Sequence, residues 1–375
     1  MCYPWYLARL IIAWPGDTNK LAREHPMSRQ LDLQPYLEDL ESRLDPEQEQ
    51  RHFDAWKQFL DGELDHGTFS PPARKPAPAA VEWPLLSIDQ ALDDMDRMLL
   101  RELKGVSDVL AGGSSATLTV RANYGVVIIA SQYGCQIARM APELNTLPTV
   151  WPLGSREAVR RAVDAGVPDL QGGEGAKVFE VGRRFMALKS QYPKIGKWVD
   201  VYHPDLQGPI DNIELVWGSD MFLGFYEEPQ LMKDFLAVMT EHYIAFLRAW
   251  FEVVPQPSEY AAHWGMRFNG QPMLRNDSLM NLSPEMYVEF IRDHDQRVIR
   301  EFGGMGAVHY CGRGDHFIEA LSEVEGLTAV NLSQPHLNDM DRIFANTVDK
   351  GIKLLALDPV AAERAGRDLK GQVHV

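Results

Sequence analysis

The segment GAVHYCGRGDHFIEALSEVEGLTAVNLS, residues 306–333, contains two short apolar runs separated by a helical pattern. The runs at 306–312 and 327–333 are bounded by glycine or serine, which is typical of buried strands. Between them, residues 316–324 place apolar side chains at helical spacing. A strand, a helix and a second strand in this order predict a parallel unit with its crossover helix.

The same alternation extends over most of the chain from about residue 115 onward. Further strands are predicted at 116–122, 147–153, 197–204, 258–265, 352–358 and 371–375. Amphipathic helices are predicted between them, as at 155–166, 228–251, 283–303 and 339–351. Eight strands alternating with helices predict an α/β protein built as a (β/α)8 TIM barrel. An open doubly wound sheet is the alternative, but no GxGxxG follows the first strand and no GxxxxGK[ST] occurs.

Composition excludes several classes of function. The 375 residues carry a formal net charge of −16, which disfavours binding to nucleic acid. The longest apolar run, WYLARLIIAW at 5–14, is too short for a membrane span and is interrupted by Arg9. Only three cysteines are present, which is too few for a disulfide framework and fits a reducing compartment. We therefore expect a cytoplasmic protein that acts on a small molecule.

The N-terminal quarter has a different texture from the rest. Residues 36–64 read as amphipathic helices, and the proline-rich stretch 69–84 reads as an extended connection. Ser87 and Gln90 then form a capping-box pattern that opens a new helix. These features predict a helical extension over 1–85 and a barrel domain over 86–375.

His309 and Cys311 are the sharpest chemical signal. Residues i and i+2 of a strand point to the same face, so both side chains can reach one ion, and an imidazole with a thiolate suits zinc. His374 is the predicted third ligand if 371–375 is the eighth strand. The alternative for each is an ordinary residue at a strand end or at the chain terminus.

Polar residues gather where the predicted strands end, which is where barrel enzymes place their active sites. His263, Asp277 and Asp315 are the predicted catalytic residues, although Asp315 also fits a helix cap in the turn GRGDH. Residues predicted to contact substrate are Asn123, Tyr124, Gln207, Arg267, Arg313, Gln334 and His336.

The runs HPDLQGPIDNIELVWG (203–218), EPQLMKDFLAVMTEHYIAF (228–246), SPEMYVEFIRDHDQRVI (283–299) and GAVHYCG (306–312) together resemble the uroporphyrinogen decarboxylase superfamily. The resemblance covers roughly residues 115–375 and implies a (β/α)8 barrel, often as a homodimer. The RQAGR-type motif of the decarboxylases is absent, and RANYG at 121–125 is a poor substitute for it. The resemblance therefore argues against uroporphyrinogen as the substrate.

A second branch of this superfamily contains corrinoid-dependent methyltransferases, which bind zinc through an HxC motif and a later cysteine. His309 and Cys311 match the first two ligands, and the later cysteine is absent. The resemblance implies a zinc-dependent methyltransferase that moves a methyl group from a corrinoid to a thiol or similar acceptor. No DxHxxG motif occurs, so the corrinoid would be bound to a separate carrier protein. The alternative is a metal-independent decarboxylase or lyase in which Arg121, Arg267 or Arg313 binds a carboxylate.

Overall fold

The computed structural model describes residues 31–256 and 259–375 of the chain. The apolar run at 5–14 and Cys2 lie outside these residues. No helix among the described residues has both the length and the apolar composition needed to cross a membrane.

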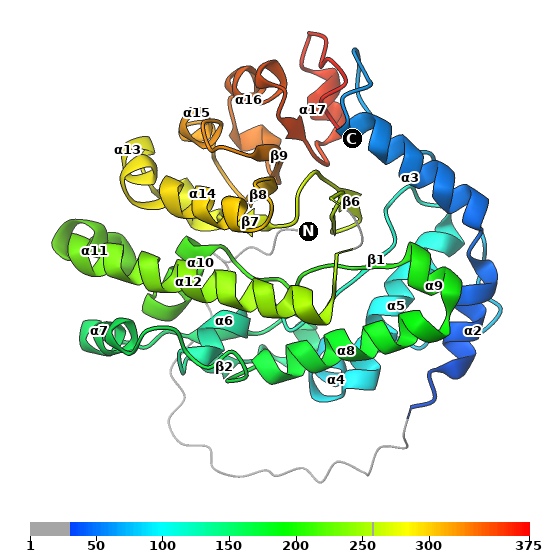
Figure 1. The fold of residues 1–375 in the computed structure, drawn as a ribbon, viewed down its shortest axis with the longest axis horizontal. Helices are drawn as coiled ribbons and strands as arrows, with labels where there is room; N and C mark the ends of the chain where they lie inside the picture. Colours follow the sequence, from blue (N-terminus) through cyan, green and yellow to red (C-terminus); the bar gives the residue numbers. More distant parts are fainter. Residues whose placement is uncertain (1–30, 257–258) are drawn as a thin grey trace.

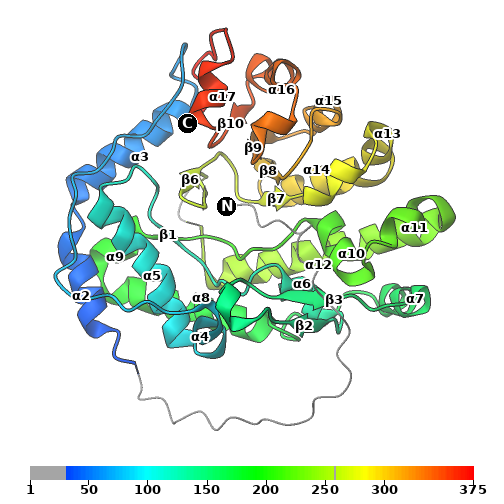
Figure 2. The ribbon, with the colours of Figure 1, turned by 180° about the vertical axis from the view of Figure 1, so that it is seen from behind.

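The chain folds as a mixed α/β protein in which strands lie toward the centre and helices lie around them (Figures 1 and 2). The main sheet is parallel, with the order β10-β9-β8-β7. Its strands are β7 (Met273–Arg275), β8 (Gly306–Tyr310), β9 (Leu327–Leu332) and β10 (Lys353–Leu354). A second parallel pair joins β1 (Thr119–Val120) to β4 (Asp200–Val201). Among the described residues these ladders remain two separate groups, so strand pairing alone does not close a barrel.

The C-terminal residues and the segment around Phe69 extend the main sheet beyond β10. Val373 forms a parallel bridge with Leu354, and His374 forms one with Phe69. Phe69 N–H donates to the Val373 carbonyl at 2.7 Å, and Val375 N–H donates back to the Phe69 carbonyl at 2.9 Å. The strand predicted at 371–375 is therefore present only as isolated bridges. Its outer partner is the N-terminal segment, which the sequence pattern did not predict.

Two predicted strands fold as antiparallel hairpins instead of parallel strands. Within 147–153, β3 (Thr149–Trp151) pairs with β2 (Gln136–Ala138). Within 258–265, β5 (Ala262–His263) pairs with β6 (Met266–Arg267) across the turn Trp264-Gly265. Both turn residues have positive φ, 48° and 79°, which is the backbone pattern of a type I′ hairpin turn. The parallel strand of this region is β7, which the sequence analysis missed.

Helices cover the outside of the strands. Their bounds are α2 (Gln34–Arg43), α3 (Pro46–Leu60), α4 (Ile88–Asp93), α5 (Met95–Gly112), α6 (Val127–Gln132), α7 (Arg156–Ala165), α8 (Gly175–Gln191), α9 (Pro193–Trp198), α10 (Pro209–Trp217), α11 (Met221–Glu227), α12 (Pro229–Val253), α13 (Pro284–Met286), α14 (Arg292–Glu301), α15 (Ile318–Leu321), α16 (Met340–Asn346) and α17 (Pro359–Glu363). Short 3-10 turns are η1 (Pro142–Leu144), η2 (Asp277–Asn281), η4 (Pro335–Leu337) and η5 (Val348–Lys350), and η3 (Tyr287–Ile291) is a π-helical turn.

Local capping chemistry explains several of these helix starts. The predicted capping box is present, because Ser87 accepts from Gln90 N–H and the Gln90 side chain accepts from Ser87 N–H. Asp94 then ends α4 and caps α5, so the predicted helix over 87–106 is two helices. Ser283 caps α13 as expected, accepting a hydrogen bond from Met286 N–H.

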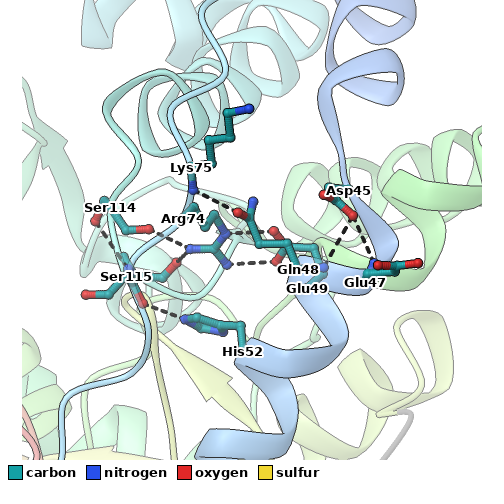
Figure 3. A network of polar contacts seen from close by, with 10 residues as sticks. Asp45, Glu47, Gln48, Glu49, His52, Arg74, Lys75, Ser114 and Ser115 are labelled. Carbon is teal, nitrogen blue, oxygen red and sulfur yellow. Dashed lines mark hydrogen bonds and ion pairs between the residues drawn. The ribbon is translucent and has the colours of Figure 1, made fainter.

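The N-terminal segment packs into the same core as the strands. Trp56 and Phe59 of α3 share a buried cluster with Ala307 of β8 and Ala329 of β9. Figure 3 shows how the proline-rich stretch is fastened: the Arg74 guanidinium makes two hydrogen bonds to the Glu49 carboxylate at 2.7 and 2.8 Å. Arg74 also donates to the carbonyls of Ser114 and Ala116 just before β1. The domain boundary near residue 85 stays a prediction, but this segment contributes directly to the core.

Candidate metal centre

Three donor side chains converge at the carboxyl ends of β7 and β8. One ligand atom each from Asp277, His309 and Cys311 lies within 4.8 Å of the other two. His309 Nε2 lies 3.5 Å from Cys311 Sγ and 3.5 Å from Asp277 Oδ1. Asp277 follows β7, and β7 pairs in parallel with β8, so the pairing brings together residues far apart in sequence. We call these three residues the donor cluster.

The tautomer of His309 is set by its neighbour on β9. His309 Nδ1 lies 2.6 Å from Asn331 Oδ1, while Asn331 Nδ2 donates to the Leu355 carbonyl at 2.7 Å. Because the Asn331 amide NH2 donates to the Leu355 carbonyl, the Asn331 oxygen faces His309 and must accept a hydrogen bond from Nδ1–H. The lone pair of neutral His309 is then on Nε2, the atom that faces Cys311 and Asp277.

Asp277 is held by its backbone and by its carboxylate. The N–H groups of Asp277 and Ser278 both donate to the Asp211 carboxylate at 2.8 Å. The Asp277 carboxylate accepts from Cys311 N–H at 2.7 Å, which ties η2 to the end of β8. Burial and the neighbouring Asp277 charge raise the pKa of Asp211. Both causes disfavour the charged form of the Asp211 carboxyl group.

A buried network supports the residue before Asp277. Asn276 N–H donates to the His309 carbonyl at 2.9 Å, and its side chain donates to Asp295 at 2.9 Å. The Tyr287 hydroxyl donates to the same Asp295 oxygen at 3.2 Å, from the π-helical turn η3. Burial raises the pKa of Asp295 to about 7.

The donor cluster fits a tetrahedral metal ion. Zinc ligands at ~2.0–2.3 Å in tetrahedral geometry lie ~3.3–3.6 Å from one another, which matches the two 3.5 Å separations. Nitrogen, sulfur and carboxylate oxygen are all ligands that zinc accepts, and three protein ligands with an open position are typical of catalytic sites. His309 also has the oriented Nδ1–H that metal-bound histidines usually show.

A layer of aromatic and basic side chains lies on one side of the donor cluster. The Trp264 ring centroid is 4.8 Å from that of His309, and the Arg275 guanidinium carbon lies over the Trp264 ring, 4.8 Å from its centroid. The His263 ring makes an edge-to-face contact with Trp264 and a tilted contact with His203, each with ring centroids 4.6 Å apart. Burial lowers the pKa of His263 well below its usual range, so this residue is neutral. His263 was predicted to be catalytic, but the structure places it behind Trp264 and outside the donor cluster.

The structure does not bring His374 to the donor cluster. Asp277 lies where the sequence analysis expected His374 as the third ligand. The His374 ring packs on Trp56 at 4.5 Å, and its Nδ1 accepts a hydrogen bond from Ala356 N–H at 3.0 Å. Burial lowers the pKa of His374 to about 4. His374 lies outside the cluster because residues 371–375 pair with Leu354 and with Phe69 of the N-terminal segment.

Several predicted contact residues have structural partners near the site. Gln207 contacts Asp211, Gln334 accepts from Gly312 N–H, and Asp315 is bound by Arg313 and by Asp339 N–H. Asp315 does not cap α15, because its second oxygen binds the start of α16 instead. His336 is exposed in η4.

The remaining predicted residues lie in other contacts. Asn123 donates to Glu102, and Tyr124 is buried beneath Lys177. Arg121 is paired with Asp205, and Arg267 with Asp200.

The sequence analysis missed Arg275, Asp211 and Asp295 as site residues. Arg275 ends the missed strand β7 and Asn276 follows it, and a strand of three residues was too short to stand out. A signal was present in Gln271-Pro272 before this strand and Asn276-Asp277 after it, since both pairs are typical of strand ends. Asp211 and Asp295 lie on helices, where a buried acid has no local signature.

None of the protein-family models matches the chain. No curated protein sequence matches it either. Among solved structures, a methyltransferase from Methanosarcina mazei is similar to it, with a TM-score of 0.54 and 16% sequence identity over 80% of this chain and 80% of that chain. At this identity the likeness concerns the fold, and it agrees with the mixed α/β architecture described above.

Proposed function

We propose that this protein is a zinc-dependent methyltransferase with a (β/α)8-type barrel, which moves a methyl group from a corrinoid to a thiol or similar acceptor. The observation on which the proposal depends is the donor cluster of Asp277, His309 and Cys311 with its oriented imidazole. The likeness of the fold to a methyltransferase supports the choice of reaction.

The residues of the chain have distinct tasks in this proposal. Asp277, His309 and Cys311 would hold the metal, and the described residues place no fourth His, Cys, Asp or Glu in this group, which leaves a position for the acceptor. Bound zinc would lower the pKa of an acceptor thiol and so supply a thiolate at neutral pH. Asn331 keeps the His309 lone pair on Nε2, and Asp211 keeps the Asp277 carboxylate in reach of the cluster.

The corrinoid would come from a separate carrier protein, because no corrinoid-binding motif of the DxHxxG type occurs in the sequence. A metal-independent carboxy-lyase is less well supported. Its predicted carboxylate-binding residues Arg121, Arg267 and Arg313 are each paired with an aspartate of the same chain, namely Asp205, Asp200 and Asp315.

The test is the zinc content of the purified full chain, measured by elemental analysis after incubation with zinc and removal of the excess. We expect about one zinc ion per chain. Cys311→Ser should lose it, whereas Cys135→Ser, a matched change at a buried cysteine outside the donor cluster, should keep it. Circular dichroism of both variants checks that the fold is retained.

Methyl transfer from free methylcobalamin to a small thiol is then assayed with each zinc-loaded sample. Activity should follow the zinc content and disappear in Cys311→Ser. A folded wild-type chain that binds no zinc would contradict the metal centre. A chain that binds zinc but moves no methyl group to any thiol or amine acceptor would contradict the reaction.

A further inference from the structure

The side of the donor cluster formed by Arg275 and His263 contains buried polar atoms that have no partner. Arg275 is 4% exposed and His263 is 0% exposed. The Arg275 Nε and both ring nitrogens of His263 make no hydrogen bond. Such groups are costly when buried, and native proteins usually satisfy them with water or a ligand.

The charges of this region are also unbalanced. Arg275 Nη2 and Arg121 Nη1 both approach a single carboxylate, that of Asp205, at 2.8 and 2.6 Å. Glu102 makes its hydrogen bond with Asn123 instead, at 2.9 Å, and burial raises the pKa of its carboxyl group. Two buried guanidinium groups therefore share one carboxylate, and a second anion would compensate the excess positive charge.

Trp264 connects this region to the donor cluster and to solvent. Its backbone is left-handed, with φ of 48°, which is unfavourable for a bulky side chain and is tolerated here by the tight β5–β6 turn. The indole lies against both His309 and Arg275 and is only partly buried. Trp264 is therefore the partly buried side chain that contacts Arg275, His263 and His309.

We infer that Arg275, His263 and Trp264 form an anion subsite, which binds the carboxylate, sulfonate or phosphate group of a small ligand. Arg275 Nε–H and the N–H of neutral His263 are the donors for the anion oxygens. The inference rests on the proposed function in one respect: a ligand whose anionic group is bound here would have its other end beside the donor cluster, where the methyl group is transferred. The binding itself requires no metal.

The test is isothermal titration of the full chain, zinc-free and zinc-loaded, with acetate, methanesulfonate, sulfate and phosphate at constant ionic strength. We expect saturable binding of at least one anion, and the preferred probe distinguishes a planar carboxylate from a tetrahedral group. Arg275→Gln should weaken that binding at least about tenfold, because a charge-assisted hydrogen bond and a charge are lost. The matched control Arg248→Gln removes an arginine of α12 whose side chain is 56% exposed and which is paired with Glu301, and it should change binding less than about twofold.

The outcomes separate the subsite from the metal centre. Anion binding by the zinc-free chain that is lost in Arg275→Gln supports the subsite whether or not zinc ever binds. Absence of saturable binding for every probe, or equal losses in Arg275→Gln and Arg248→Gln, overturns it and leaves an adventitious ion only. If Arg275→Gln does not fold, His263→Phe decides, because it keeps an aromatic ring and removes both ring nitrogens; unchanged anion binding in that variant contradicts the inference.

Discussion

Asn331→Ala should weaken zinc binding without touching any of the three proposed ligands. Asn331 Oδ1 accepts from His309 Nδ1 at 2.6 Å, and Asn331 is not itself one of the proposed metal ligands. Without this acceptor the buried imidazole, which is 4% exposed, loses the contact that fixes its tautomer and orientation. The variant therefore isolates the contribution of orientation to the donor cluster.

The expected magnitude follows from two independent considerations. Leaving a buried N–H without a partner costs about 1–3 kcal/mol. Removing the outer partner of a metal-bound histidine typically lowers metal affinity about 10–100-fold, which corresponds to about 1.4–2.8 kcal/mol. The two ranges agree, so we expect the zinc dissociation constant of Asn331→Ala to rise by about one to two orders of magnitude.

The assay is a competition titration of zinc against a chromophoric chelator, with the urea midpoint measured on the same samples. Asn331→Asp is the informative partner variant, because it keeps an oxygen acceptor for His309 and loses the donor to the Leu355 carbonyl. It should bind zinc about as well as the wild type while being less stable. Zinc affinity of Asn331→Ala within about twofold of the wild type, or equal losses in the two variants, would refute the reasoning.

Three further predictions concern the support of the site and the fold. Glu49→Gln should lower the free energy of unfolding by about 3–5 kcal/mol in urea titrations, because it leaves the buried Arg74 guanidinium without its counter-charge; a loss below about 1 kcal/mol would contradict this. Gly208→Ala should weaken zinc binding and stability together, since its Cβ would lie 2.1 Å from the Asn276 side chain, whereas Gly105→Ala, with no atom within 4 Å of the new Cβ, should not. The pKa of Asp295 is raised to about 7 from an ordinary value of 3.8, so its stabilising contribution is complete below about pH 4 and is lost as pH rises toward 7. Asp295→Asn should therefore gain stability relative to the wild type between pH 5 and pH 8 in paired urea titrations, and a constant difference across that range would disprove the assignment.

The prediction of His309 and Cys311 as one chemical unit depended on local geometry alone. Alternate residues of a strand share a face, and the structure places His309 Nε2 and Cys311 Sγ 3.5 Å apart as that rule requires. Helix starts at Ser87 and Ser283 were equally predictable, because a cap involves residues only three positions apart. Alternating strands and helices also indicated the α/β class.

The third donor could not be found in this way. Asp277 lies 34 positions from Cys311, and the two meet because β7 and β8 pair in parallel. The sequence analysis placed the strand of this region at 258–265, where the Trp264-Gly265 turn instead makes an antiparallel hairpin. The prediction of His374 as a ligand also depended on long-range pairing that the sequence does not show. Its segment pairs with Phe69 of the N-terminal segment, away from the donor cluster.

Local patterns in the sequence were thus sufficient for the class of fold, for the helix caps and for the paired donors on β8. The tertiary structure alone decided that Asp277 completes the donor cluster, that Asn331 orients His309, and that Arg275 lies beside them with an unsatisfied N–H. The physical reason is the distance along the sequence over which each interaction acts. Caps and strand faces are set by steric and hydrogen-bonding preferences over a few residues, whereas the partners of a buried polar group depend on which distant strands become neighbours when the core packs.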